Sequence, residues 1–68
     1  MTYDLASLKD GIDLYNQAVN EINNGRDDSA RPKLEDAKQF FQLCEGTHSA
    51  AKDWLAKTIE KLGEIEES

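Results

Sequence analysis

Three runs of apolar residues with helical spacing constrain this chain more than any other feature of its sequence. The first run has spacings of 3, 4, 3, 4 and 3, and it consists of Leu5, Leu8, Ile12, Tyr15, Val19 and Ile22. This spacing keeps one face of a helix apolar over several turns. It predicts a helix over residues 4–24, capped by Thr2 or Asp4 and ended by Asn23, Asn24 and Gly25. Gly11 interrupts this helix at a cost of about 1 kcal/mol relative to Ala, so either a neighbouring helix approaches there or the chain tolerates the loss.

The second run has spacings of 4, 3, 4 and 3, and it consists of Ala30, Leu34, Ala37, Phe41 and Cys44. It predicts a helix over residues 29–45 that Gly46 ends. Ser29 or Asp28 is the expected cap, because a short polar side chain accepts a hydrogen bond from an unpaired backbone N–H of the first turn. With Ser29 as the cap, Pro32 falls in the first turn, where a missing N–H has no consequence.

The third run predicts a helix over residues 48–66, capped by Thr47 or Ser49. Its apolar positions are Ala51, Trp54, Leu55, Thr58 or Ile59, Leu62 and Ile65. Three amphipathic helices with short joints predict an all-α fold, an antiparallel up-down-up three-helix bundle that forms one domain over residues 1–68. No segment has the alternating pattern of a strand.

The composition narrows the function classes. The chain has 68 residues, with 14 Asp and Glu against 8 Lys and Arg, and its net charge is −6. An acidic chain is disfavoured as a partner of nucleic acid or of an anionic membrane surface. No apolar stretch approaches the roughly 20 residues that span a bilayer, and the first residues lack the pattern of a signal peptide. The single Cys excludes an intrachain disulfide. We therefore expect a soluble cytoplasmic protein.

The reactive side chains offer no recognisable catalytic or metal site. His48 is the only His, and it stands in the loop after Gly46 without a second His or Cys at ligand spacing. We expect it to be an exposed loop residue. Cys44 continues the apolar face of its helix, so we expect it to be buried as a small hydrophobic residue.

Two pairs of carboxylates share helix faces, Asp10 with Asp13 and Glu60 with Glu64. General acid–base chemistry needs a cleft and a raised pKa on one partner, whereas Lys residues accompany both pairs on polar faces. We expect a solvated surface at both places. The sequence thus predicts no catalytic, cofactor-binding or metal-binding residue, no cofactor and no enzymatic activity.

The large aromatic residues are the best candidates for binding another protein. Phe40 and Phe41 are consecutive, so they point about 100° apart on a helix, and Trp54 has the same relation to Leu55. One member of each pair is expected to be partly exposed, and exposed aromatic residues are enriched in protein interfaces. We take Phe40, Trp54 and Tyr15 as candidate partner-binding residues.

The segment from Gly11 to Leu43 resembles one tetratricopeptide repeat, a helical hairpin that recurs at about 34 residues. The resemblance rests on small residues in both helices, a turn glycine and one large apolar site, namely Ala18, Gly25, Ala30, Leu34 and Ala37. Glu21 departs from it, since the family has an aromatic residue there. Hairpin and third helix together are similar to the microtubule-interacting and transport domain, which binds peptide helices in its interhelical grooves. No peptide-contacting residue can be carried over from either family.

The resemblance implies that the line of Ile12, Tyr15, Val19 and Ile22 corresponds to an open ligand groove in repeat proteins. In a single hairpin that line must be covered, and we expect the third helix to cover it. The leading hypothesis is a protein–protein interaction module with a protein or peptide partner. The alternatives are a self-associating homodimeric structural protein and an acidic inhibitor that mimics the charge of DNA.

Overall fold

The chain forms three helices in the computed structural model, which describes residues 5–67. The helices are α1 (Leu5–Asn23), α2 (Asp27–Cys44) and α3 (Ala50–Glu67). The two residues predicted to cap the first helix, Thr2 and Asp4, lie outside the described residues. Within 5–67 no helix combines the length and the apolar content that a membrane crossing requires.

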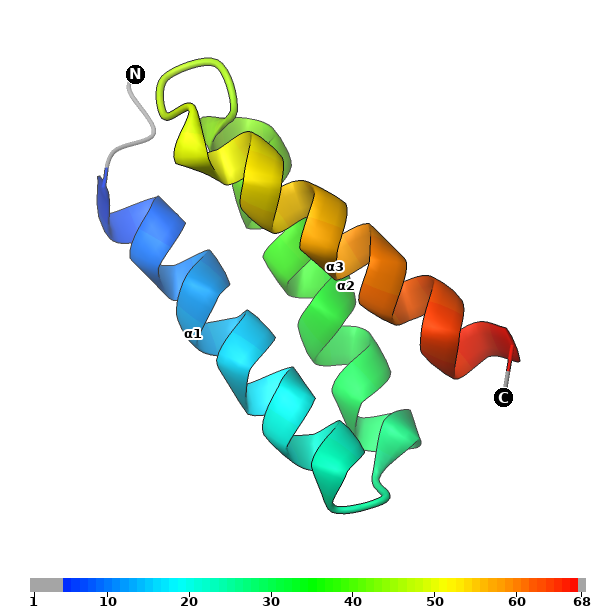
Figure 1. Ribbon diagram of the computed structural model, residues 1–68. Helices are drawn as coiled ribbons and strands as arrows, with labels where there is room; N and C mark the ends of the chain where they lie inside the picture. The colour runs from blue at the N-terminus through cyan, green and yellow to red at the C-terminus, as the bar shows by residue number, and fades with distance from the viewer. Residues whose placement is uncertain (1–4, 68) are drawn as a thin grey trace.

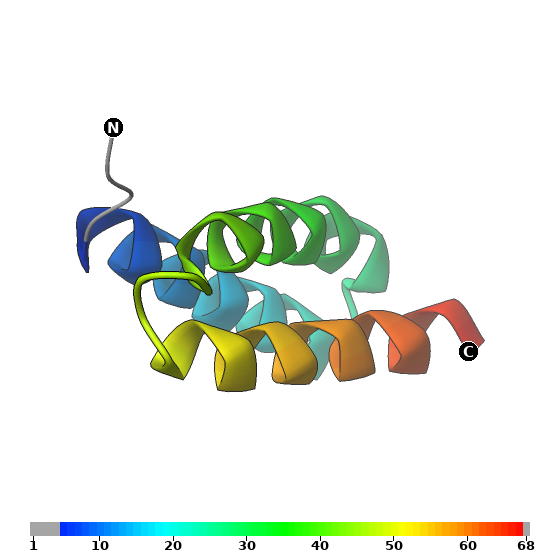
Figure 2. The same ribbon diagram turned by 90° about the horizontal axis from the view of Figure 1, so that it is seen from above.

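Successive helices run in opposite directions, so the predicted antiparallel three-helix bundle is confirmed (Figures 1 and 2). The second helix is the centre of the packing. Both α1 and α3 have extensive contacts with α2, whereas α1 and α3 have few with each other. The bundle is therefore open on the side where α1 and α3 face one another.

The joint between α1 and α2 is a tight turn built on Gly25, which has φ of +77°. The Arg26 N–H donates to the carbonyl of Glu21 at 2.8 Å, and the Gly25 N–H donates to the carbonyl of Ile22 at 3.0 Å. These two bonds form a Schellman motif, in which a residue in the left-handed region satisfies the last carbonyls of a helix. The first helix thus ends at Asn23, within the predicted stop of Asn23, Asn24 and Gly25.

The prediction that Ser29 or Asp28 caps the second helix is wrong, because α2 begins at Asp27. Arg26 precedes the helix and makes no side-chain capping bond. Its carbonyl accepts the N–H of Ser29 at 3.1 Å, so the backbone of the turn starts the helix without a polar cap. Pro32 consequently lies inside α2 rather than in its first turn.

The joint between α2 and α3 is organised around the carbonyl of Cys44. This oxygen accepts the N–H groups of Thr47 at 2.9 Å and of His48 at 2.8 Å. It also accepts the hydroxyl of Thr47 at 3.1 Å. The Thr47 side chain thus completes the end of α2, and it does not cap α3, which begins later, at Ala50.

The core consists of two clusters, both centred on α2. One cluster is formed by Leu8, Ala37, Phe41, Cys44 and Ala51. The other is formed by Ala18, Ala30, Leu34, Leu62 and Ile65. Every residue of the second predicted run is completely buried. The side chain of Tyr15 packs against both clusters and connects them.

The third helix faces the core with Thr58 rather than with Ile59. Thr58 is fully buried, whereas Ile59 is 49% exposed. The Thr58 hydroxyl donates to the carbonyl of Trp54 at 2.7 Å, so its buried oxygen has a partner. A buried hydroxyl without such a bond would destabilise the fold.

Gly11 marks the closest approach between α1 and α2. A Cβ built on Gly11 would lie 2.7 Å from Cε1 of Phe41 and 3.1 Å from Cβ of Phe40. Real Cβ atoms do not come so close to a buried ring. Of the two explanations for a glycine inside this helix, the approach of a neighbouring helix is therefore the right one.

Candidate functional site

An aromatic cluster fixes Trp54 at the open side of the bundle. The edge of Tyr15 on α1 meets the Trp54 ring, with centroids 5.4 Å apart and planes at 73°. The ring of Phe41 on α2 stacks on Trp54, with centroids 6.0 Å apart and planes at 23°. The Lys57 ammonium lies 4.9 Å from the centroid of the Trp54 ring, a cation–π contact. Trp54 is thus held by all three helices.

A surface groove of about 340 Å³ runs between α1 and α3 beside this cluster. We call it the α1–α3 groove. Its lining comes from two residues of α1 and five of α3: Tyr15, Asn16, Trp54, Lys57, Glu60, Lys61 and Glu64. The base of the groove is aromatic, and its α3 side is charged.

On α1, the apolar side chains that flank Tyr15 are only half-buried by the bundle, although they do not line the groove themselves. Ile12 and Val19 lie one turn before and one turn after Tyr15, on the same helix face, and both are half-buried. Ile12 packs against the first core cluster. Val19 is not among the side chains that pack against either cluster in residues 5–67. The expected covering of the apolar line of α1 by the third helix is therefore only partial.

Phe40, the third candidate, does not join the groove. It is half-buried and lines a separate hollow of about 240 Å³ on α2, with Asp36, Gln39 and Leu43. Leu43 is 46% exposed there. The structure therefore brings Tyr15 and Trp54 together and places Phe40 elsewhere, with only one exposed apolar neighbour on its hollow.

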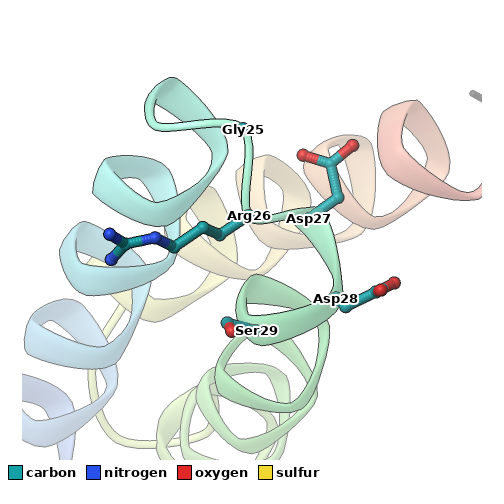
Figure 3. Close-up of a pocket in the computed structure, with 5 residues that line it drawn as sticks. All are labelled: Gly25, Arg26, Asp27, Asp28 and Ser29. Atoms are coloured by element: carbon teal, nitrogen blue, oxygen red, sulfur yellow. The ribbon is translucent and has the colours of Figure 1, made fainter.

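A third hollow, of about 330 Å³, lies at the turn between α1 and α2 (Figure 3). The Arg26 side chain extends back along α1, and its Nη1 lies 3.6 Å from Oε1 of Glu21. Asp27 and Asp28 point away from the guanidinium (Figure 3). The charges of this turn diverge, so they do not converge on a common ligand.

The two reactive residues, Cys44 and His48, lie at the joint between α2 and α3. Cys44 is fully buried, as predicted, whereas His48 is half-buried, so the prediction of an exposed loop histidine is wrong in degree. The backbone bond from His48 to Cys44 draws the loop against the end of α2. Among residues 5–67, no three His, Cys, Asp or Glu side chains are grouped in a way that could hold a metal ion.

The charged residues of the groove were not identified as site residues from the sequence. The sequence predicted only a solvated helix face for these four residues, Lys57, Glu60, Lys61 and Glu64. The signal that was present is their spacing, because residues at i, i+3, i+4 and i+7 share one helix face. The sequence alone could not show that this face of α3 borders the open side of the bundle.

Comparisons with known proteins do not assign this chain to a family. No family model, no curated protein and no solved structure matches it. The resemblance to a tetratricopeptide hairpin thus stays a prediction.

Proposed function

We propose that this chain is a small non-catalytic protein–protein interaction module, whose α1–α3 groove binds a helical segment of a protein partner. The observation that carries the proposal is the packing of the bundle. Because α1 and α3 rest on α2 and hardly on each other, the apolar face of α1 is only half-buried beside the groove, and Tyr15 of that face lines it. Amphipathic helices bind such grooves through apolar residues spaced three and four apart.

The base of the groove is suited to binding because it is already ordered. Trp54 contacts Tyr15, Phe41 and Lys57, so little side-chain freedom remains to be lost when a partner binds. Binding of a partner costs about 0.5–1.5 kcal/mol for each flexible side chain that becomes fixed. Large aromatic side chains at the centre of an interface are also those that contribute most to affinity.

The charge distribution favours a protein partner over the alternatives. The groove carries two Lys and two Glu residues, which is not the basic surface that binds phosphates. Exposed acidic residues lie on all three helices, for example Asp13, Glu35 and Glu66, whereas a mimic of DNA would mass them on one side. The proposal includes the cytoplasm as the compartment, since the single buried thiol suits a reducing environment.

The test is a selection of helical peptides from a random library displayed on phage, with the folded chain as the target. Trp54 is the only Trp, so its fluorescence reports directly on the groove. We expect selected peptides to shift Trp54 emission and to bind the Asn16→Lys variant at least about tenfold more weakly, because Asn16 is exposed in the groove lining and the new charge must be buried on binding.

Ile59→Lys is the matched control, since Ile59 is exposed and lies outside the groove lining. It should leave peptide binding unchanged, and circular dichroism should show both variants to be folded. If the selected peptides bind Asn16→Lys as well as they bind the unmodified chain, or leave Trp54 emission unchanged, the groove is not the binding site.

A further inference from the structure

The charged residues of α3 that line the groove form a symmetric pattern. Lys57 and Lys61 alternate with Glu60 and Glu64 along one helix face, in the order Lys, Glu, Lys, Glu. Within the chain this order places like charges four residues apart, which is unfavourable on a helix, and opposite charges three residues apart, which is favourable. The intrachain compensation is slight: Lys61 Nζ lies 3.8 Å from Glu64 Oε1, and the Glu64 side chain is 57% exposed.

Two copies of this charge pattern are complementary when the two α3 helices face each other in antiparallel orientation. A two-fold axis between residues 60 and 61, perpendicular to α3, places Lys57 opposite Glu64 of a second copy. The same axis places Glu60 opposite Lys61 of the second copy. All four side chains then face an opposite charge, whereas a parallel alignment in the same register would place each one opposite its own kind.

We infer that the occupant of the α1–α3 groove is a second copy of this chain, bound with its α3 antiparallel to the first. This inference rests on the proposed function, because it names the partner of the same groove. A two-fold interface uses one surface patch on both subunits, and that patch must be complementary to itself. The groove lining satisfies this requirement in charge.

The charged and apolar parts of the groove have different roles in the dimer. The half-buried Tyr15 and Trp54 supply apolar surface. The ion pairs fix direction and register, since charge complementarity across an interface contributes more to specificity than to affinity. Exposed ion pairs contribute little each, so the dimer is weak and dissociates on dilution.

The test uses two variants with opposite charges on the groove. K57E/K61E makes the stripe entirely acidic, and E60K/E64K makes it entirely basic. Sedimentation equilibrium over a concentration range should give a dimer for the unmodified chain and dimers weakened about 10- to 100-fold for each variant alone. An equimolar mixture of the two variants should associate again as a heterodimer, because all four opposing pairs are restored.

The basic variant separates this pairing from a general effect of charge. E60K/E64K makes the acidic chain less negative, so simple relief of repulsion predicts stronger self-association, whereas the antiparallel pairing predicts weaker self-association. Dimers of both variants with unchanged affinity would overturn the inference, and so would a mixture that fails to associate.

A monomer at every concentration, for the unmodified chain and for the mixture, would also overturn the inference. The proposed function would stand in that case if selected peptides still bound the groove in the fluorescence assay. Both the proposed function and the inference would fail if, in addition, the selected peptides bound outside the groove.

Discussion

Replacing Gly11 by Ala tests the closest contact in the bundle. In most helices this substitution is stabilising, because Ala is favoured over Gly by about 1 kcal/mol. Here the new methyl group would lie 2.7 Å from Cε1 of Phe41. The ring cannot move aside freely, since Phe41 is fully buried and stacks on Trp54. The second contact, 3.1 Å from Cβ of Phe40, joins the methyl group to an atom that moves only with the backbone of α2.

The expected magnitude follows from two opposing terms. Inserting a methyl group into a packed core costs about 1–3 kcal/mol, and the helix preference returns about 1 kcal/mol. Gly11→Ala should therefore lower the free energy of unfolding by up to about 2 kcal/mol. Gly63→Ala is the matched control, because a Cβ at Gly63 inside α3 meets nothing within 4 Å. It should raise the free energy of unfolding by up to about 1 kcal/mol.

Urea denaturation followed by circular dichroism measures both variants. In a domain of this size 1 kcal/mol corresponds to about 4–8 °C in melting temperature, so thermal melts should also separate them. Phe41→Leu removes the ring atoms that clash, and in combination with Gly11→Ala it should show a favourable coupling of about 0.5–3 kcal/mol. If Gly11→Ala stabilises the chain as much as Gly63→Ala does, α1 and α2 do not meet at this position.

Two further substitutions test the turn and the core. Gly25→Ala should lower the free energy of unfolding by about 1–2 kcal/mol, because Gly25 has φ of +77°; Gly46→Ala, at a joint glycine without positive φ, should change it by much less in the same urea titration. Leu34→Ala should cost about 2–5 kcal/mol, because Leu34 is fully buried, whereas Leu43→Ala at a 46% exposed position should stay within about 0.5 kcal/mol. Equal losses at the two leucines would contradict the orientation of α2.

The sequence was sufficient to predict the helices and the buried face of the central one. The second apolar run lies entirely in the core because α2 is covered on both sides, so its 3-4 spacing had a single interpretation. The start of α2 could not be predicted in the same way. A preference for Asp or Ser caps is weak compared with the backbone bonds that Gly25 and Arg26 make, and these bonds set where the helix begins.

The groove could be predicted only in part, for a geometric reason. The spacing identifies Tyr15 and Trp54 as residues of apolar faces, yet it does not give the distance between two helices that are not neighbours in the chain. The choice between Thr58 and Ile59 depends on a rotation of α3 of about 100°, and that rotation also decides which charged residues border the groove. The packing of α3 on α2 determines this rotation, and no local sequence pattern predicts it.

The central position of α2 also has a consequence for how the chain acquires its structure. Almost all interhelical packing joins helices that are adjacent in the chain, and the joints between them are a few residues long. Contacts between segments close in sequence require only short loops to close, and helical bundles with this property fold within microseconds to milliseconds. The sparse contact between α1 and α3 leaves the groove open. It also means that folding requires few contacts between segments distant in the sequence, so we expect it to be fast.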